Sequence, residues 1–312
     1  MTIQNVLLPT DFSDTADQAL AKAIDVAEHF GATLHLFHVI DHLDPSWYGI
    51  TNVQEETIRM RDQIRNEAEA LLEDMASSEP SLSLSTEIAL EFSFNVPSTV
   101  MEYAGANDID LIVMGTHGRG GFGRFMLGSV ANKLVRRAPS PVLTVNPSAS
   151  DDAPPEDPAT TGVLAPIDFS KYARTALRAA KTFAHTYDVP LHLLFVAEKR
   201  TVPTFRDTGI PGVGVVGMDD DIIENATPAL DDLNQDVGGP TVNARYHVRH
   251  GAAAHAIVDV AQEQDLNLIV MATRGLSGLD RWMLGSTTER VVRTSTCPVL
   301  TLRAETEEEA NQ

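Results

Sequence analysis

A glycine-rich stretch carries the residue types best suited to binding an anion. Residues 115–129 read GTHGRGGFGRFMLGS and lie between an apolar run and a helical pattern. Glycine permits positive φ and lets a phosphate approach the backbone N–H groups closely. A helix that begins at the end of such a loop adds free N–H groups and the positive end of its dipole. The stretch therefore predicts a phosphate cradle, and its spacing decides which kind.

Two known phosphate motifs overlap in this stretch, and both fail on context. Gly118-x-Gly120-x-x-Gly123 has the spacing of a dinucleotide fingerprint, but it follows the fourth apolar run instead of the first. The acid expected about 20 residues further on is also missing. Gly123-x-x-x-x-Gly128-Ser129 lacks the lysine of a P-loop. Neither a Rossmann dinucleotide site nor a P-loop ATPase is predicted.

One domain-length sequence pattern occurs twice in the chain, with a constant offset between the two copies. LLPTDFSDTA at 7–16 recurs as LAPIDFSKYA at 164–173, and the glycine stretch with its preceding run, 111–129, recurs at 268–286. Chance matches would not share one offset, so the chain is a duplicated domain. The predicted organisation is a first domain, a Pro- and Asp-rich linker, a second domain and an acidic tail, at residues 1–146, 147–160, 161–304 and 305–312 respectively.

Duplication shows which glycines matter. Both copies keep a glycine, nine residues and then Gly-Ser, as Gly118 with Gly128-Ser129 and as Gly275 with Gly285-Ser286. We predict that Ser129 is the N-cap of a helix over 130–138, whose N-terminus would bind the anion. Arginines add positive charge to the two loops, at positions 119, 124, 274 and 281. The alternative is that the glycines only make turns and the serine only caps a helix.

Within one copy, short apolar runs alternate with helical patterns. The runs lie at 3–8, 32–39, 109–114 and 141–145, with an alternating segment at 81–91. Helices are predicted between them, the first with an alanine stripe from Ala16 to Ala27 and Gly31 as its C-cap. This order predicts two doubly wound α/β domains, each a five-stranded parallel sheet in the order 3-2-1-4-5 flanked by helices.

These features together resemble the universal stress protein family in its tandem two-domain form, over nearly the whole chain. Its ATP-binding members carry G-x2-G-x9-G-[ST] after the fourth strand, and the first copy matches this pattern fully from Gly115 to Ser129. The second copy departs at Ala272, where the first glycine of the pattern should be. An alanine methyl could crowd a ribose there, so the resemblance leaves the second site open.

The resemblance also implies which residues surround the nucleotide. In the first copy, loop glycines and Ser129 would contact ribose and phosphates, and residues near the strand ends would line the adenosine pocket. These positions are Gly115, Gly118, Gly128 and Ser129, with Pro9, Asp11, Val39 and Met114. The matching positions of the second copy are Pro166, Asp168, Val196, Met271, Gly275, Gly285 and Ser286. The resemblance further implies an intramolecular pseudo-dimer in which the last strands, 141–145 and 298–302, face each other.

Asp11 and Asp168 allow two interpretations. Each begins a D-F-S sequence before a helix and could cap that helix, although Ser13 and Ser170 would serve equally well. The interpretation we favour places the aspartate at the nucleotide, through Mg²⁺ or ribose. A metal site at His247 and His250 is not predicted, because residues i and i+3 of a strand point to opposite faces. No catalytic residue is predicted.

Composition limits the partners. The formal net charge of −21 disfavours nucleic acid, and no apolar run approaches the ~20 residues of a membrane helix. Only 5 of the 23 basic residues are lysines, which is typical of a salt-adapted protein, an ordinary acidic protein being the alternative. One cysteine, Cys297, excludes an internal disulfide and is expected to be buried packing. These features, and the lack of a signal peptide at the start, favour the cytoplasm.

Three functions remain open on the sequence. The first is an ATP-binding stress protein that acts as a regulatory module through an unknown protein partner, alone or as a further homodimer; slow hydrolysis is allowed. The second is a scaffold that keeps the fold without nucleotide. The third is an adenylyl-transferring enzyme, which would need a Ser-Gly-Gly type loop where the sequence has PTDFSD at 9–14.

Overall fold

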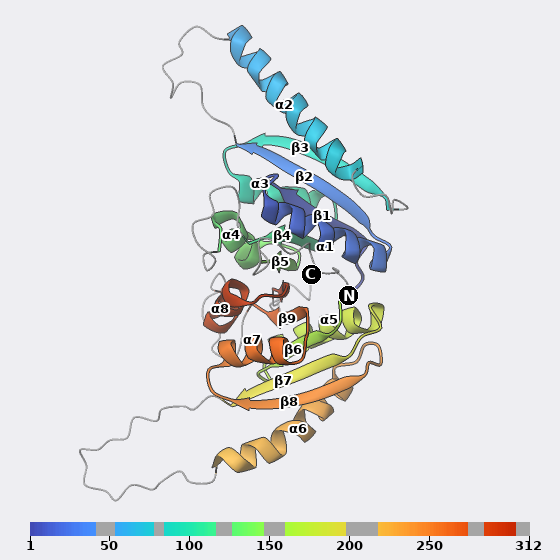
Figure 1. The fold of residues 1–312 in the computed structure, drawn as a ribbon, viewed down its shortest axis with the longest axis vertical. Helices are drawn as coiled ribbons and strands as arrows, with labels where there is room; N and C mark the ends of the chain where they lie inside the picture. Colours follow the sequence, from blue (N-terminus) through green and yellow to red (C-terminus); the bar gives the residue numbers. More distant parts are fainter. Residues whose placement is uncertain are drawn as a thin grey trace, which may run out of the picture. The chain divides into compact units, whose positions relative to one another are not determined.

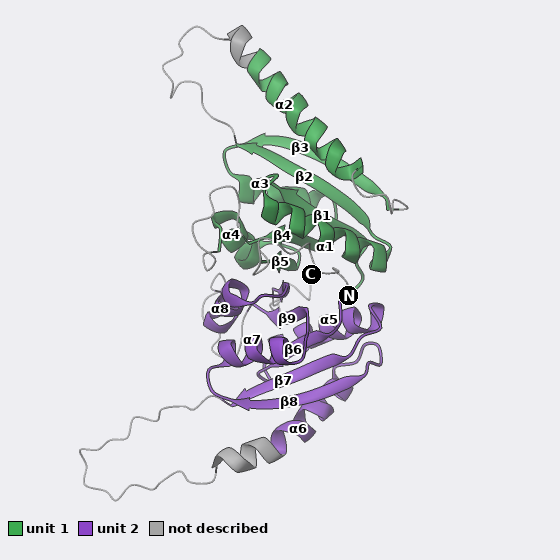
Figure 2. Ribbon diagram, viewed as in Figure 1, with its two compact units in different colours: residues 1–159 green, residues 160–312 purple. Residues whose placement is uncertain are grey.

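The chain divides into two compact units, residues 1–159 and 160–312 (Figure 2). The computed structural model describes residues 1–41, 54–77, 84–116, 127–146, 160–197, 218–273 and 284–303. Most of the predicted linker and the acidic tail lie outside these residues. So do residues 201–217 of the second copy, a segment rich in glycine and proline.

Each unit alternates strands and helices in the predicted order (Figure 1). The elements of the first unit are β1 (Asn5–Thr10), α1 (Asp14–Phe30), β2 (Thr33–Asp41), α2 (Gln54–Ser77), β3 (Thr86–Ser93), α3 (Val96–Ala106), β4 (Leu111–Gly115), α4 (Ser129–Arg137) and β5 (Val142–Val145). Those of the second are β6 (Val163–Ile167), α5 (Lys171–Thr186), β7 (Leu191–Ala197), α6 (Met218–Asp236), β8 (Ala244–His250), α7 (Ala253–Glu263), β9 (Leu268–Ala272), α8 (Ser286–Thr294) and β10 (Val299–Leu302).

Each unit contains a parallel sheet with the same topology. The strand order is β3-β2-β1-β4-β5 in the first unit and β8-β7-β6-β9-β10 in the second, which is the predicted order 3-2-1-4-5. All strand pairs within a unit are parallel. Strands β1, β4 and β5 are almost completely buried, which explains why their sequences are continuous apolar runs.

The chain changes direction across the sheet between β1 and β4. It runs outward through β2 and β3, then returns to β4 and continues to β5 on the other side. Since parallel crossovers are right-handed, α1 and α2 cover one face and α3 and α4 the other. Side-chain contacts agree with this assignment of the helices to faces. The ring centroids of Phe37 on β2 and Tyr103 on α3 are 4.3 Å apart, and the Arg61 Cζ of α2 lies 4.7 Å from the ring centroid of Phe92 on β3. In doubly wound folds the ligand-binding crevice lies where the strand order reverses, which here is at the carboxyl ends of β1 and β4.

Helix α1 shows how local sequence sets these elements. Ser13 is its N-cap, accepting a hydrogen bond from the backbone N–H of Ala16, and alanines from Ala16 to Ala27 form its buried stripe. Gly31 ends the helix with φ of 64°, the left-handed conformation expected of a C-cap glycine.

Element boundaries differ slightly from the prediction. Strands β1 and β4 begin two residues later than the apolar runs, because Ile3 and Ile109 are buried without joining the ladder. The alternating segment corresponds to β3, which starts at Thr86, later than expected. Within the described residues, no helix is both long and apolar enough to cross a membrane.

Candidate functional site

The loop after β1 is organised by Asp11. Its Oδ1 accepts hydrogen bonds from the Ser13 hydroxyl at 2.7 Å and the Ser13 backbone N–H at 3.2 Å. Ser13 in turn caps α1 through the N–H of Ala16. In the second unit, Asp168 accepts from the Ser170 N–H at 3.0 Å in the same way. The serine is therefore the cap, and the aspartate orients it at the crevice.

An aromatic residue follows each aspartate in a strained backbone conformation. Phe12 has φ of 58° and Phe169 has φ of 60°, which is unfavourable for a bulky side chain. The Phe12 ring packs 4.6 Å from the ring of His38, whose Nδ1–H donates to the Thr10 carbonyl at 2.7 Å. Strain retained at the same position in both units is typical of a loop whose shape serves a site.

The end of β4 packs directly against the first turn of α1. A Cβ built on Gly115 would lie 2.7 Å from the Thr15 Cγ2 and 3.0 Å from the Thr15 carbonyl oxygen, so only glycine fits beside α1. Beyond it, the N–H of Gly128 donates to the Thr116 carbonyl at 2.8 Å. This bond joins the two ends of the glycine loop, and Gly285 and Thr273 make the same bond in the second unit.

The predicted cap at Ser129 is wrong. Gly128 is the N-cap of α4, with extended backbone angles (φ −56°, ψ 154°), and Ser129 is already the first helical residue. Gly285 and Ser286 are arranged identically at α8. Neither helix has a side-chain cap hydrogen bond. The correction strengthens the anion prediction, because the first N–H groups of α4 are not occupied by a serine hydroxyl.

Charge separates the two helix N-termini that meet at the first crevice. The first turn of α1 contains Asp14 and Asp17, close to Asp11. Burial, and then the negative charges of Asp14 and Asp11, raise the pKa of the Asp17 carboxyl. The first turn of α4 contains no acid. An anion in the crevice is therefore attracted to α4 and repelled by α1, whereas the aspartates suit a cation.

The second crevice distributes its charges differently. The first turn of α5 contains no acid and begins with Lys171, while the first turn of α8 carries Glu289. The N-terminus of α8 is thus a weaker anion site than that of α4 by one nearby negative charge. Lys171 offers a compensating positive charge on the opposite side of the crevice.

The structure brings most predicted site residues to these crevices and leaves some outside its described part. Gly115 and Gly128 lie at the two ends of the loop after β4, and Asp11 lies in the loop after β1. Pro9 is half-buried on β1, while Val39 and Met114 are buried near the ends of β2 and β4. The equivalents in the second unit occupy matching positions: Pro166, Val196 and Met271 lie on β6, β7 and β9, Asp168 follows β6, and Gly285 and Ser286 begin α8. Gly118, Gly275 and the four loop arginines lie outside the described residues.

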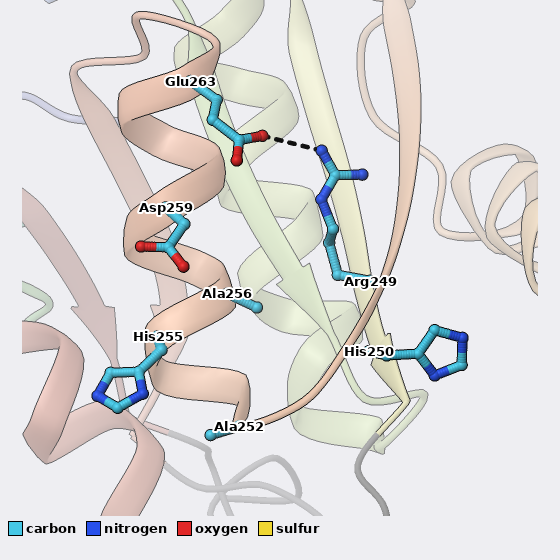
Figure 3. A pocket seen from close by; sticks show the side chains of 7 residues that line it. All are labelled: Arg249, His250, Ala252, His255, Ala256, Asp259 and Glu263. Atoms are coloured by element: carbon cyan, nitrogen blue, oxygen red, sulfur yellow. Dashed lines mark hydrogen bonds and ion pairs between the residues drawn. The ribbon is translucent and has the colours of Figure 1, made fainter.

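A shallow pocket of about 160 Å³ lies elsewhere in the second unit, between the end of β8 and α7 (Figure 3). An ion pair between Arg249 and Glu263, at 3.0 Å, borders it. None of its lining residues is a predicted site residue: Arg249, His250, Ala252, His255, Ala256, Asp259 and Glu263. In the described part of the chain, no group of three His, Cys, Asp or Glu residues is arranged to hold a metal.

Two findings concern residues to which the sequence assigned no role or only packing. Cys297 is buried as expected, and its N–H donates to the Ser295 hydroxyl. His247, considered only with His250, instead pairs with His192, whose Nδ1 lies 2.9 Å from the His247 Nε2. The sequence signal for His192 was a polar residue inside the buried strand LHLLFVA, matched by His35 in the first copy.

The serines at the two helix N-termini make a matched test of this geometry. Ser13→Ala removes the hydroxyl that caps α1 and is expected to lower the free energy of unfolding by about 1 kcal/mol. Ser129→Ala is expected to change it by less than about 0.5 kcal/mol, because Ser129 is exposed and caps nothing. Urea unfolding of both variants checks this, and equal losses would contradict the assignment of the caps.

Known proteins share this architecture along the full chain. A universal stress protein of Mycolicibacterium smegmatis is 26% identical and covers 97% of this chain and 98% of its own. A universal stress protein of Mycobacterium tuberculosis is 28% identical over 96% of both chains. A solved structure of a universal stress protein from Archaeoglobus fulgidus, 21% identical, superposes over 97% of this chain and 99% of its own with a TM-score of 0.70.

The sequence model of the universal stress protein family matches this chain twice. The two matches cover residues 2–146 and 161–303, one in each compact unit. They include both D-F-S loops and both Gly-Ser helix starts. With the duplicated sheet topology, the two matches show that the chain belongs to the universal stress protein family and carries two of its domains in tandem.

Proposed function

We propose that this protein binds ATP at the crevice of each domain and acts as a nucleotide-responsive regulatory module of the cytoplasm. The triphosphate would lie at the N-terminus of α4 or α8, and the adenosine against the ends of the first two strands of each domain. No residue in the described part of the chain is assigned as a general base, so binding and not rapid turnover is the proposed activity, and slow hydrolysis stays allowed. Three further points stay predictions. They are a partner protein that recognises the nucleotide-bound form, the pairing of the two domains through their last strands, and further homodimerisation.

The observation that carries the proposal is the contrast between α1 and α4. Both helices begin at the same crevice, but α1 is capped by Ser13 and surrounded by aspartates, whereas α4 has no side-chain cap and no acid in its first turn. A phosphate at α4 gains backbone N–H donors and the helix dipole without displacing a protein group. The negative charges of Asp11 and Asp14, on the opposite side, would attract a Mg²⁺ ion that accompanies the phosphates.

We propose that the second site is retained despite Ala272. The equivalent Gly115 directs its missing Cβ at Thr15 of α1, which means that this position faces the neighbouring helix. Ala272 is 8% exposed, as expected for a methyl group covered by α5. Its methyl group would therefore not point at a ribose. Glu289 in the first turn of α8 would still make the second site weaker than the first.

Calorimetric titration of the full chain with Mg-ATP tests the proposal directly. Wild type is expected to bind two nucleotides, and Gly118→Val to bind one, because a β-branched residue restricts the backbone and fills space that a phosphate needs. Gly275→Val is the matched variant for the second domain. Absence of binding at millimolar ATP would support the scaffold alternative, and rapid pyrophosphate release would support the adenylyl transferase.

A further inference from the structure

The second domain contains a histidine pair between its two outer strands. His192 of β7 is 1% exposed, and its Nδ1 lies 2.9 Å from the Nε2 of His247 on β8. The rings are nearly parallel, at 14°, with centroids 5.0 Å apart. In the sheet register His192 lies opposite Arg245, so His247 is its diagonal neighbour. The two imidazoles thus form a direct side-chain hydrogen bond across the edge of the sheet.

Hydrogen-bond accounting locates the proton in this bond. His192 Nε2 is buried and has no hydrogen-bond partner among the described residues. If that nitrogen carried the proton, a buried N–H would be left without an acceptor, which is costly. The proton therefore resides on His192 Nδ1, which donates to His247 Nε2, and His192 Nε2 presents only a lone pair. The pair is neutral and shares one bridging proton.

The equivalent histidine of the first domain has different neighbours. The Nδ1 of His35 lies 3.1 Å from the Tyr103 hydroxyl and 3.6 Å from a Glu87 carboxylate oxygen. Glu87 is the register partner of His35, whereas Arg245 is the register partner of His192. A positive charge on the buried ring is thus stabilised by an acid in the first domain and opposed by a base in the second.

Charged groups around the pair reinforce this difference. On β8, Arg245 and Arg249 are close enough to disfavour a positive charge on His247, and Glu263 of α7 favours it. Glu263 is already joined to Arg249 in an ion pair (Figure 3). The positive charge of Arg249 therefore offsets much of the stabilisation that Glu263 would give to a protonated His247. In the described parts of the elements packed against β8, α7 also carries Asp259 and His255, and α6, on the other face, carries Asp231, Asp232 and Asp236. Asp231 accepts a hydrogen bond from the Tyr246 hydroxyl.

We propose that the His192–His247 pair is an acid-sensitive latch that holds strand β8 onto the second domain near neutral pH and releases it in acid. An additional proton could bind the neutral pair at only two positions. On the bridging nitrogens it would set two N–H groups against each other, and on His192 Nε2 it would be buried without an acceptor. Opening the β7–β8 edge exposes both rings to water and relieves either conflict. Opening would also move Val196 at the end of β7 and thereby disturb the second nucleotide site, a consequence that rests on the proposed function.

The direction of the pH effect follows from the buried ring. Burial, the neighbouring His247 and Arg245 lower the pKa of His192 from 6.5 to about 4. The closed form therefore binds fewer protons than the open form, so the latch is fully stable above pH 6.5 and weakens as the pH falls toward 4. For this single histidine, linkage gives a roughly 20-fold larger opening constant at pH 5 than at pH 7.

Hydrogen exchange of the nucleotide-free full chain tests the latch independently of any ATP binding. After division by the intrinsic exchange rate at each pH, the opening constant of β7 and β8 should rise roughly 20-fold between pH 7 and pH 5. His192→Leu removes the buried base at similar volume and should reduce the rise to less than about threefold, because His247 can then be protonated near solvent. His35→Leu is the matched control and should leave the exchange of β7 and β8 unchanged.

Nitrogen-15 spectra of the histidine rings supply a second readout that needs no variant. His192 is expected as the neutral Nδ1–H form at pH 7, with the bridging proton coupled to both rings. A protonated Nε2 on His192 at pH 7 would overturn the latch. So would an equal rise in opening for wild type and His192→Leu, or a rise in β2 and β3 as large as that in β7 and β8.

Discussion

Replacing Ser129 with proline is expected to weaken ATP binding at the first domain by roughly tenfold or more while leaving the fold intact. Ser129 is the first helical residue of α4, a position at which proline is well tolerated because its N–H makes no intrahelical bond. The preceding Gly128, at φ −56° and ψ 154°, already has the conformation that a following proline requires. The variant therefore removes one phosphate donor and little else.

The magnitude comes from the type of hydrogen bond that is lost. A backbone N–H donating to a charged phosphate contributes about 1.5–3 kcal/mol, and 1.4 kcal/mol corresponds to a tenfold change in affinity. Ser286→Pro is the matched variant at α8 and should affect only the second site. Calorimetry gives both affinities, and urea unfolding verifies that stability is retained. Unchanged affinity in Ser129→Pro at unchanged stability would exclude α4 as the phosphate site.

Replacing Gly115 with alanine is expected to destabilise the first domain by about 1–3 kcal/mol. The new Cβ would lie 2.7 Å from the Thr15 Cγ2 and 3.0 Å from the Thr15 carbonyl oxygen. Because the carbonyl is part of the first turn of α1, the clash cannot be relieved by a side-chain rotation alone. Helix α1 must shift away from β4, at the point where both elements border the crevice.

Two further variants separate packing from ligand binding at this position. Thr15→Ser in the Gly115→Ala background removes the closest atom, Cγ2, and should restore part of the lost stability. Ala272→Gly makes the reverse change in the second domain and should cost about 0.5–1 kcal/mol, because glycine loses more backbone entropy on folding. Urea unfolding measures both, with hydrogen exchange of α1 and β4 assigning the change to the first domain. Wild-type stability in Gly115→Ala would contradict the packing role.

Sequence reasoning predicted the fold well because its signals were local and repeated. The buried parallel strands appear as apolar runs, the alanine stripe marks the inner face of α1, and Gly31 ends it in the left-handed conformation. The sequence segments that recur at a constant offset then showed that both halves of the chain have the same fold. Boundaries were less certain, since a buried isoleucine such as Ile3 belongs to the core whether or not its backbone pairs.

The sequence predicted which loops flank the candidate site, and its assignment of the α4 cap was wrong. Proximity of the loops after β1 and β4 follows from the topology, but the cap of α4 depends on backbone angles, which placed Gly128 and not Ser129 at that position. The meaning of Ala272 also changed, because only the packing of α1 against Gly115 shows where a methyl group at this position would point.

The amino-acid sequence by itself determined the duplication, the strand–helix alternation and the loops that flank each crevice, because periodicity and turn residues act over a few neighbouring positions. Only the tertiary structure decided which buried polar groups meet. His35 and His192 occupy equivalent positions in nearly identical strands, yet one faces Glu87 and the other His247 and Arg245. Strand register brings these partners together, and a one-residue change in register would turn them to the opposite face of the sheet, so no local pattern could reveal the pair.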